Sequence, residues 1–550
     1  LLRMAAAKAK INSALQGYEP LSIVLGTTAA IGALYATCKF ASDPKGAIKA
    51  IAGTLMSAAK FVPGVQGKVE GEINKMLDKA TGHFRVAGDE HTYGAIPEEP
   101  LSEEVLVKYL EGCAAKEQPG WKDGKVSGKV YNGEPSVISV MNAVYKLYCV
   151  SNALHPDVFP SIRKFEAETI RMTCTMLHGN EETCGTLTAG GTESILMAMK
   201  TYREYGRKAR GIQFPEVIMS EGAHAAFDKA QEYFGIKVIR TPINPDGTTN
   251  IEALAAKINA NTVGIVGSTP NYAHGSIDDI EAMAELALRH NILLHVDACL
   301  GGFFLPWAQK LGYGVKPFDF AVKGVSTISC DTHKYGFGPK GESTLLFANR
   351  ALRRYMYFIQ PDWNGGIYAS PTVAGSRAGA PIAGTWAVLV TTGEKGYLNA
   401  TKGMMEAHKE IVEGTKHIKE LELICDHPSP VLAWKSSNID IFMIIDAMKK
   451  KRWVLDALQS PNAIHICLTV RHIGKGKEFV RDLIEAVEMI KTDPGQFQGG
   501  MAPVYGMAAS IPDRSIIREF VAGYLDRLLD ITGAAPAAAS NTASSSNSQQ

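Results

Sequence analysis

The sequence carries almost no net charge. Its 550 residues include 57 lysines and arginines against 56 aspartates and glutamates, a formal balance of +1. Proteins that bind nucleic acids concentrate positive charge on one surface, and this balance gives no indication of such a surface. We therefore expect no nucleic-acid partner.

Motifs for disulfides, structural metals and nucleotides are also missing. The nine cysteines are scattered, without a CxxC pair and without the cysteine–histidine spacing of a zinc site. This usage predicts reduced thiols and no metal centre. The chain has neither a GxGxxG motif nor a Walker lysine, so nucleotide binding is poorly supported.

Long uncharged runs are scarce, and the N-terminal region contains the one that matters. Residues 20–38, PLSIVLGTTAAIGALYATC, form nineteen uncharged positions diluted by glycine, threonine and alanine. As a helix they would extend roughly 28 Å, close to the thickness of a bilayer core. A membrane anchor, a cleaved signal peptide and a buried helix are all compatible with this run. The anchor is favoured because the run is long for a signal peptide and lacks a clear A-x-A cleavage site.

The length predicts more than one domain, because a chain of 550 residues exceeds what a single core normally supports. The last segment, GAAPAAASNTASSSNSQQ, is of low complexity and predicts disorder. The expected segments are an N-terminal part with a candidate transmembrane helix (1–40), a helical linker (41–90), an N-terminal catalytic segment (91–165), a large domain (166–375), a C-terminal small domain (376–532) and a disordered tail (533–550).

Short β-branched runs alternate with amphipathic stretches in the middle of the chain. The predicted strands are 216–220, 237–241, 262–268 and 291–297, and 278–290 is a typical intervening helix. This alternation predicts a mainly parallel sheet with helices on both faces. In such sheets ligands bind beyond the carboxyl ends of the strands. A smaller α/β unit is expected to follow, with an apolar stretch at 438–448, a helix over 449–459, an apolar run at 463–470 and a closing helix at 476–491.

Two glycines and a threonine precede a helix in LTAGGTESILMAMK. The N–H groups at the start of a helix suit a phosphate, and Thr192 can cap the helix or offer its hydroxyl. An ordinary helix start after a glycine turn explains the same residues. Taken alone, Gly191 and Thr192 do not establish a phosphate site.

Two further residues change that balance. Asp297 ends a strongly apolar strand, where a charge is costly unless it has a partner such as the protonated ring nitrogen of pyridoxal phosphate. Lys334 follows in the glycine-rich CDTHKYGFGPKG, and a partly desolvated lysine can act as a Schiff-base nucleophile. A helix cap or salt bridge for Asp297 and a solvated surface position for Lys334 are the alternatives. The order of phosphate cup, aspartate and lysine matches the division of labour in pyridoxal phosphate sites.

Four segments resemble the sphingosine-1-phosphate lyase family: STISCDTHKYGFGPKG, HVDACLGGFFLPW, TAGGTESILMA and WNGGIYASPTVAGSRAG. This family comprises fold-type I pyridoxal phosphate enzymes of the group II decarboxylase superfamily, and the resemblance covers roughly residues 90–530. The chain departs from the family at Ala153, where proline is usual, and at Cys330 and Gly338, where alanine is usual. None of these changes removes a chemical group.

The resemblance implies a role for each candidate residue. Lys334 bonds covalently to the cofactor, Asp297 pairs with its ring nitrogen, and His224 stacks on its ring. The remaining implied site residues are Gly191, Thr192 and His333 for the cofactor phosphate, Tyr272 for the pocket wall, Tyr131, His155 and Lys340 for the substrate phosphate, and Ser376 for the cofactor from the second chain. Tyr131 is also a candidate for proton transfer. A helix-start role for His224, a core position for Tyr131 and a turn position for Ser376 remain open.

The resemblance also implies a fold and an activity. The expected fold is α/β, with an aspartate-aminotransferase-like large domain of mainly parallel sheet, a smaller C-terminal α/β domain and an N-terminal membrane helix. The expected reaction is a retro-aldol cleavage of the C2–C3 bond of a phosphorylated sphingoid base, which gives a long-chain aldehyde and phosphoethanolamine in sphingolipid degradation. Either Lys334 or Tyr131 can be the base at the C3 hydroxyl. An amino-acid decarboxylase of the same superfamily and a non-catalytic, membrane-bound lipid-binding protein are the alternatives.

The resemblance further implies where the protein acts and with what. Its relatives in eukaryotes are anchored in the endoplasmic reticulum membrane with the catalytic domain facing the cytosol, which agrees with the uncharged run at 20–38. They form homodimers with shared active sites, so a homodimer is expected here.

Overall fold

A computed structural model describes residues 65–82, 93–117, 119–497 and 514–531. The predicted span at 20–38 and the predicted tail at 533–550 lie outside these ranges. Within the described ranges, no helix combines the length and the apolar character needed to cross a membrane.

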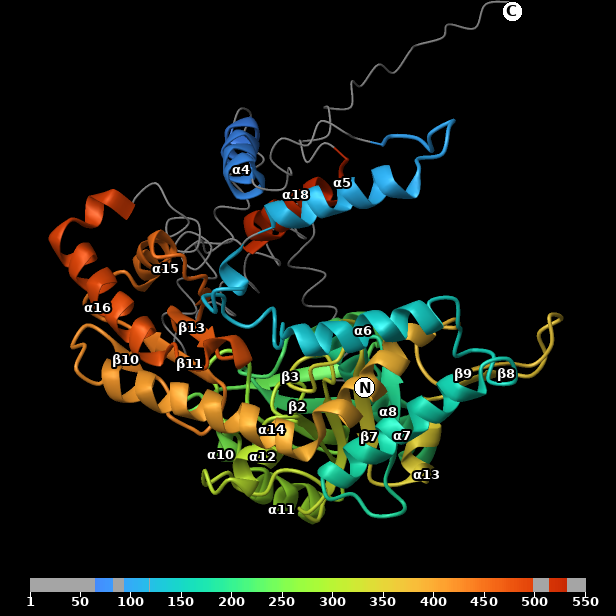
Figure 1. The fold of residues 1–550 in the computed structure, drawn as a ribbon. Helices are drawn as coiled ribbons and strands as arrows, with labels where there is room; N and C mark the ends of the chain where they lie inside the picture. The colour runs from blue at the N-terminus through green and yellow to red at the C-terminus, as the bar shows by residue number, and fades with distance from the viewer. Residues whose placement is uncertain (1–64, 83–92, 118, 498–513, 532–550) are drawn as a thin grey trace, which may run out of the picture. The chain divides into compact units, whose positions relative to one another are not determined.

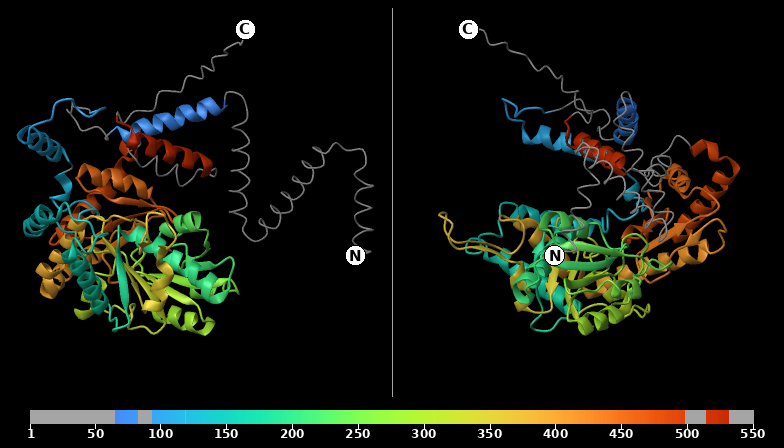
Figure 2. Two further views of the ribbon diagram at one scale, coloured as in Figure 1. Left: turned by 90° about the vertical axis from the view of Figure 1, so that its right-hand side faces the viewer. Right: turned by 180° about the vertical axis from the view of Figure 1, so that it is seen from behind.

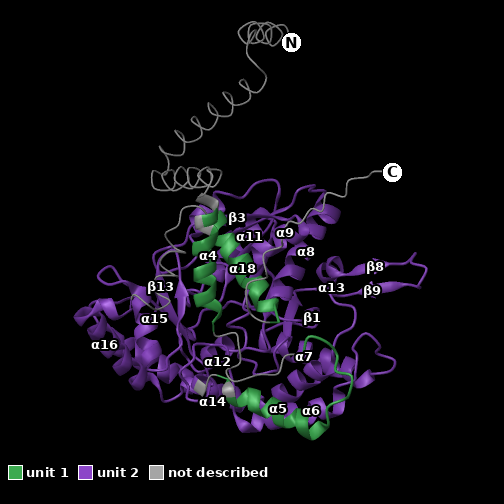
Figure 3. Ribbon diagram, turned by 90° about the horizontal axis from the view of Figure 1, so that it is seen from above, with its two compact units in different colours: residues 1–117, 504–550 green, residues 118–503 purple. Residues whose placement is uncertain are grey.

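The chain divides into two units (Figure 3), one made of residues 1–117 and 504–550 and the other of residues 118–503. The six-segment division expected from the sequence remains a prediction. The described helices of the first unit are α4 (Val65–Thr81), α5 (Glu103–Lys116) and α18 (Arg514–Leu529). Helices α4 and α18 are joined by the buried Arg527 guanidinium, which donates to Asp78 at 2.6 Å and to Thr81 at 3.2 Å.

The second unit is built around a seven-stranded sheet (Figure 1). Its strands are β1 (Cys184–Thr188), β2 (Glu216–Ser220), β3 (Lys237–Thr241), β4 (Thr262–Ser268), β5 (Leu293–Asp297), β6 (Val325–Cys330) and β7 (Ser343–Phe347). They lie in the order β1-β7-β6-β5-β4-β2-β3. Neighbours from β6 to β3 pair in parallel, and β7 is antiparallel to both β6 and β1. The predicted mainly parallel sheet is confirmed, with one antiparallel strand near its edge.

Helices cover both faces of this sheet (Figures 1 and 2). They are α8 (Gly191–Arg210), α9 (Ala226–Phe234), α10 (Ile251–Ala255), α11 (Ile280–His290) and α12 (Leu305–Lys310). Alternate strand residues serve the two faces, since Val217 and Met219 belong to the core under α8 and α9 while Ile218 belongs to the core under α11. Burial on both faces explains why the strands read as continuous apolar runs.

Further helices complete the large domain and lead to the small one. They are α6 (Pro135–Tyr148), α7 (Pro160–Met176), α13 (Arg350–Arg353) and α14 (Gly379–Thr415), with the 3₁₀ turns Pro119–Trp121 and Arg354–Met356. Helix α14 packs on α6, on α7 and on α16 (Gly476–Thr492), and its helical geometry is interrupted at Gly393, where φ is 59°. A two-stranded hairpin, β8 (Phe358–Gln360) and β9 (Tyr368–Ser370), extends from the large domain.

The small domain carries an antiparallel sheet in the order β10-β11-β13-β12. Its elements are β10 (Glu422–Leu423), β11 (Val431–Lys435), α15 (Ile441–Lys450), β12 (Asp456–Leu458), β13 (Ala463–Cys467), α16 (Gly476–Thr492) and the 3₁₀ turns Val470–His472 and Pro494–Phe497. The helix predicted over 449–459 was wrong, because the helix is α15 and residues 456–458 form a strand. The Asp440 side chain caps α15 by accepting from the Phe442 N–H at 3.0 Å, and the apolar face of this helix is buried.

Candidate active site

Most of the predicted site residues meet in one cavity of about 420 Å³ at the carboxyl edge of the large sheet. Asp297 is the last residue of β5, Lys334 follows β6, and His224 and Tyr272 follow β2 and β4. The predicted residues that line the cavity are Tyr131, Gly191, Thr192, His224, Tyr272, Asp297, His333 and Lys334. Because parallel strands end at the same edge, residues far apart in the sequence come together there.

One end of the cavity is formed by the turn from β1 into α8. Gly190 has a φ of 130°, a conformation that favours glycine, and a β-carbon at this position would lie 3.4 Å from His333 Cε1. The Nδ1 atom of His333 is buried and has no hydrogen-bond partner among the described residues. Burial lowers the pKa of His333, which favours a neutral imidazole. The first N–H groups of α8 and this unpartnered nitrogen fit a phosphate group.

The carboxylate of Asp297 is held in place by two hydrogen bonds. Its Oδ1 accepts from the Cys299 N–H at 3.1 Å and from the Ser329 hydroxyl at 3.3 Å. Ser329 also lies 3.2 Å from Nε2 of the buried His295. Burial lowers the pKa of His295 to about 4, so this imidazole is neutral near pH 7.

A hydrogen-bonded chain continues behind His295. Its Nδ1 lies 2.8 Å from the Thr327 hydroxyl, which in turn lies 2.8 Å from the Tyr202 hydroxyl. With the imidazole proton on Nε2, every bond is satisfied: Tyr202 donates to Thr327, Thr327 to His295, His295 to Ser329, and Ser329 to Asp297. In this arrangement the chain ends with the Ser329 hydroxyl donating to the Asp297 carboxylate, which fixes the orientation of that carboxylate. The sequence reasoning missed these supporting residues, although His295 could have been noticed as a histidine inside an apolar strand.

The amine of Lys334 faces a carboxylate that the sequence reasoning also missed. Asp331 Oδ2 lies 2.8 Å from Lys334 Nζ, and the Asp331 side chain is 1% exposed. Burial alone would lower the pKa of Lys334, but Asp331 outweighs it and the net shift is upward. The available signal was an aspartate three residues before the lysine, directly after a buried strand.

Tyr131 and Lys340 lie together beside this lysine. Lys340 Nζ is 4.6 Å from the centroid of the Tyr131 ring, and Tyr131 packs edge-on against Tyr335. Burial raises the pKa of Tyr131, so its phenol stays protonated near neutral pH. Burial, followed by the charge of Lys334, lowers the pKa of Lys340 to about 8. Lys340 does not line the cavity, although it contacts a residue that does.

His224 and Tyr272 are oriented by neighbouring groups. His224 Nδ1 accepts from the Ala226 N–H at 3.1 Å, which directs the imidazole at the start of α9. The ring of Tyr272 stands edge-on to His465 of the small domain, with 4.7 Å between centroids. The small domain therefore supports one wall of the cavity.

The structure does not bring His155 and Ser376 to the cavity of this chain. Both are exposed, and they belong to neighbouring loops joined through Asn152. The Asn152 side chain donates to the Ser376 hydroxyl at 3.0 Å and accepts from the Leu154 and Arg377 N–H groups. Asn152 thus links the two loops that carry His155 and Ser376, outside the cavity.

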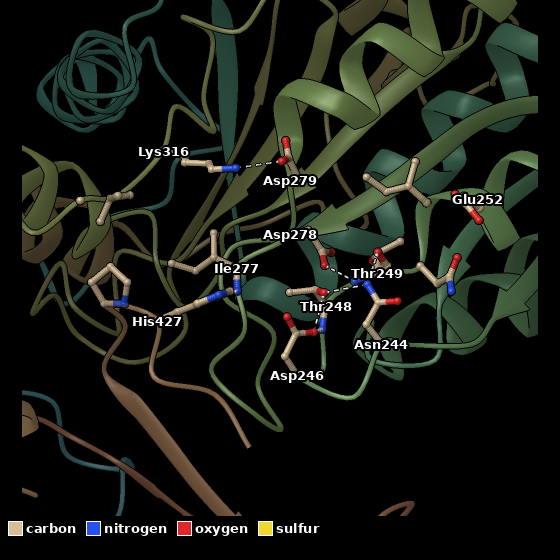
Figure 4. A pocket seen from close by; sticks show the side chains of 15 residues that line it. Asn244, Asp246, Thr248, Thr249, Glu252, Ile277, Asp278, Asp279, Lys316 and His427 are labelled. Atoms are coloured by element: carbon tan, nitrogen blue, oxygen red, sulfur yellow. Dashed lines mark hydrogen bonds and ion pairs between the residues drawn. The ribbon is translucent and has the colours of Figure 1, made fainter. Parts of the chain in front are cut away.

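A larger cavity, of about 640 Å³, lies elsewhere in the same unit (Figure 4). It contains several carboxylates, but Asp278 accepts from two backbone N–H groups and Asp279 pairs with Lys316 at 3.0 Å. Both of these carboxylates are therefore already bonded to neighbouring groups. Within the described ranges, no three histidine, cysteine or acidic side chains are placed to hold a metal ion.

The smaller cavity fits pyridoxal phosphate by the chemistry of its residues. It offers a lysine amine, a supported carboxylate for a ring nitrogen, an imidazole at a helix start and a phosphate cup.

Comparison with known proteins agrees with this fit. Residues 92–436 match the family described as the pyridoxal-dependent decarboxylase conserved domain. The chain is 41% identical to a sphingosine-1-phosphate lyase of Arabidopsis thaliana over 94% of its own length and 97% of the relative, and 38% identical to sphingosine-1-phosphate lyase 1 of Mus musculus over 95% and 92%.

Solved structures show the same relationship. A sphingosine-1-phosphate lyase of Burkholderia pseudomallei is 37% identical, with a TM-score of 0.74 over 81% of this chain and 99% of that one. A glutamate decarboxylase of Lactobacillus brevis, at 19% identity and a TM-score of 0.64, shares the fold. The chain therefore belongs to the pyridoxal-dependent decarboxylase family and, within it, to the sphingosine-1-phosphate lyases.

Proposed function

We propose that this protein is a pyridoxal phosphate-dependent aldehyde-lyase that cleaves the C2–C3 bond of phosphorylated sphingoid bases. The products are a long-chain aldehyde and phosphoethanolamine, and the reaction degrades sphingolipids. The observation that carries the proposal is the convergence of Lys334, Asp297 and the start of α8 on one cavity. Relatives of about 40% identity that are named sphingosine-1-phosphate lyase support the choice of substrate.

Each residue of the cavity has a defined task in this reaction. The start of α8 and His333 hold the cofactor phosphate, Lys334 is the covalent attachment point, and Asp297 bonds the ring nitrogen. The bound cofactor supplies an electron sink for the carbon left after bond cleavage. The hydrogen bonds from the Cys299 N–H and the Ser329 hydroxyl hold the Asp297 carboxylate in place for that bond.

The substrate phosphate requires positive charge and hydroxyl donors. Lys340 and Tyr131 lie together next to the cavity and supply both. Because its pKa is raised, Tyr131 stays protonated near pH 7 and can donate a hydrogen bond. An amino-acid decarboxylase has no comparable need for a phosphate-binding pair.

A second subunit completes the site in this proposal. His155 and Ser376 lie together but outside the cavity of their own chain, so the chain presents them to a second copy. Apolar side chains of and beside α6 are exposed, including Tyr145 (43%), Leu147 (73%) and Val150 (84%), and the β8–β9 hairpin exposes Trp363 (54%). Helix α6 has no buried residue, which suits a surface covered by a second copy.

The N-terminal run at 20–38 anchors the protein in the endoplasmic reticulum membrane in this proposal, with the catalytic domain in the cytosol. A single-chain amphiphile partitions into bilayers, so an enzyme held at a membrane meets it there. The uncharged character and the length of the run support the anchor.

The two lysines of one loop provide a matched test of the chemistry. Lys334→Ala is expected to abolish both the cofactor absorbance band and aldehyde formation from sphingosine 1-phosphate. Lys340→Ala is expected to keep the band and to raise KM by about 10- to 100-fold, the value of a charge-assisted hydrogen bond of roughly 1.5–3 kcal/mol. Aldehyde formation by Lys334→Ala would contradict the mechanism, and carbon dioxide release from glutamate without aldehyde from the lipid would contradict the substrate.

Lys340 also predicts a pH dependence. Its pKa of about 8 means that its positive charge is present below pH 8 and lost as the pH rises through that value. We expect kcat/KM, which reports the free enzyme, to fall above about pH 8 because the phosphate grip weakens. In Lys340→Arg the charge persists at high pH, so this part of the fall should disappear. An identical profile in the two proteins would exclude Lys340 as its source.

Mixed dimers test the shared site. Leu147→Asp and Val150→Asp together are expected to give folded monomers by sedimentation, because each charge would be buried in the interface. Lys334→Ala and His155→Ala are each expected to be inactive. When the two variants are unfolded and refolded together, about half of the dimers should be mixed, and each mixed dimer should have one intact site of two. The mixture should therefore regain about one quarter of wild-type activity. No recovery in mixed dimers isolated with two different tags would show that each chain builds its own site.

Removal of residues 1–40 tests the anchor. The shortened protein is expected to leave the membrane fraction while it keeps its activity on detergent-dispersed substrate. An internal control is the full chain treated with carbonate at high pH, which strips peripheral proteins and should leave this one in the membrane. Its release by carbonate would contradict the anchor.

A further inference from the structure

Asp331 is a buried carboxyl group for which the proposed reaction has no task so far. It follows β6 directly and is 2% exposed. Its Oδ2 contacts Lys334 Nζ at 2.8 Å, while its Oδ1 is enclosed and has no hydrogen-bond partner among the described residues. A β-carbon at Gly191 would lie 2.6 Å from both oxygens, so the carboxyl group packs against the start of α8.

The charges of this pair depend on each other. Burial alone would raise the pKa of Asp331, but Lys334 and His333 outweigh it and the net shift is downward. Burial alone would lower the pKa of Lys334, and Asp331 reverses that shift. The free lysine is therefore an ammonium ion, and loss of the carboxylate would leave an unpaired buried charge that is relieved by deprotonation.

This charge state decides what the lysine can do. An ammonium nitrogen has no lone pair, so it can donate a proton but cannot attack a carbonyl carbon. A neutral Lys334 would react with an aldehyde: its nitrogen bonds to the carbonyl carbon, and the oxygen leaves as water with two protons. The proposed reaction releases a long-chain aldehyde beside this nitrogen, and such a bond would inactivate the enzyme.

We propose that Asp331 is a positioning residue that keeps Lys334 an ammonium ion whenever its nitrogen is not bonded to the cofactor, and thereby protects it from the aldehyde product. When Lys334 must bond to the cofactor, one N–H bond breaks and one O–H bond forms on Asp331 across the 2.8 Å contact. The proton returns when the lysine is freed. The proposal has two parts. The protective part, that Lys334 is shielded from the aldehyde, rests on the proposed lyase function. The charge part, that Asp331 keeps Lys334 an ammonium ion, does not.

Other groups near the pair must be included when its pH dependence is interpreted. Apart from the Ser343 hydroxyl of β7, the groups that bear on the charges of Asp331 and Lys334 are titratable. They include His333 and Lys340 of the same loop, Cys299 after β5, Cys330 at the end of β6, Tyr131 before α6, Tyr272 after β4 and Cys467 at the end of β13. Of these, Lys340 titrates in the experimental range, at about pH 8. It serves as an internal control.

The charge part is tested on the full-length chain freed of cofactor. Butanal forms a Schiff base only with neutral amines, and cyanoborohydride reduces that Schiff base to a stable secondary amine. Mass spectrometry then measures the extent of this modification at each lysine. In the wild type, the labelling rate of Lys340 should reach half its maximum near pH 8. The labelling rate of Lys334 should be low at that pH and should rise about tenfold with each pH unit up to pH 10, because its amine is still mostly protonated.

Substitutions at Asp331 show whether its charge, rather than limited access of butanal to Lys334, slows the labelling. Asp331→Asn keeps the size of the side chain but removes its charge, and should raise labelling of Lys334 at pH 7.5 by more than about tenfold, which is one unit of pKa. Asp331→Glu should return it toward the wild type. Unchanged labelling in Asp331→Asn would overturn the proposal. If that variant does not fold by circular dichroism, a wild-type Lys334 midpoint below pH 9 would overturn it instead.

The protective part is tested during turnover. Holoenzyme carrying Asp331→Asn should lose activity progressively on sphingosine 1-phosphate, and borohydride should trap the aldehyde on Lys334. The wild type should show neither effect. Absence of the adduct in the variant would overturn the protective role, whereas failure of the wild type to form any aldehyde would instead overturn the proposed function.

Discussion

Strands β2, β4, β5 and β6 run in parallel and end at the same edge of one buried sheet, and the active site depends on this arrangement. Helices cover both faces of the sheet, so polar side chains can reach a ligand at the ends of the strands. Asp297 ends β5 and Lys334 follows the neighbouring strand β6, so both residues line the same cavity. The helix α8, which packs on this sheet, adds the positive end of its dipole at the same edge.

Burial then decides the protonation of the groups that meet there. The same loss of water makes His295 a neutral hydrogen-bond relay and Tyr131 a persistent donor, because neither has a close opposite charge that outweighs burial. Lys334 instead keeps its charge, because the contact with the Asp331 carboxylate outweighs burial and raises its pKa. Burial, followed by the charge of Lys334, lowers the pKa of Lys340. Burial thus favours the uncharged form of all four groups, and only at Lys334 does a neighbouring carboxylate reverse the shift.

The exposed apolar surface gives the remaining physical constraint on this chain. Helix α6 and the β8–β9 hairpin present side chains such as Leu147 and Trp363 to solvent in a single copy. A surface of this kind is costly in water unless a partner covers it. His155 and Ser376 are exposed as well, outside the cavity of their own chain.

The sequence alone predicted what depends on local pattern. The bounds of β2, β3 and β4 agree with the predicted strands, because β-branched runs bounded by turn residues carry their own signal. It also predicted the residues lining the cavity where a motif marked them, as at Gly191, Asp297 and Lys334. It failed at 449–459, where an N-cap at Asp440 and burial of the face of α15 outweighed the local pattern. Only the tertiary structure decided the partners: that Asp331 faces Lys334, that His295 supports Asp297, and that His155 lies away from the cavity of its own chain. Asp331 and Lys334 are close in the sequence, but only the conformation of the turn after β6 decides that their side chains meet. The support of Asp297 by His295 through Ser329 follows from the pairing of β5 with β6, and no local sequence pattern encodes that pairing.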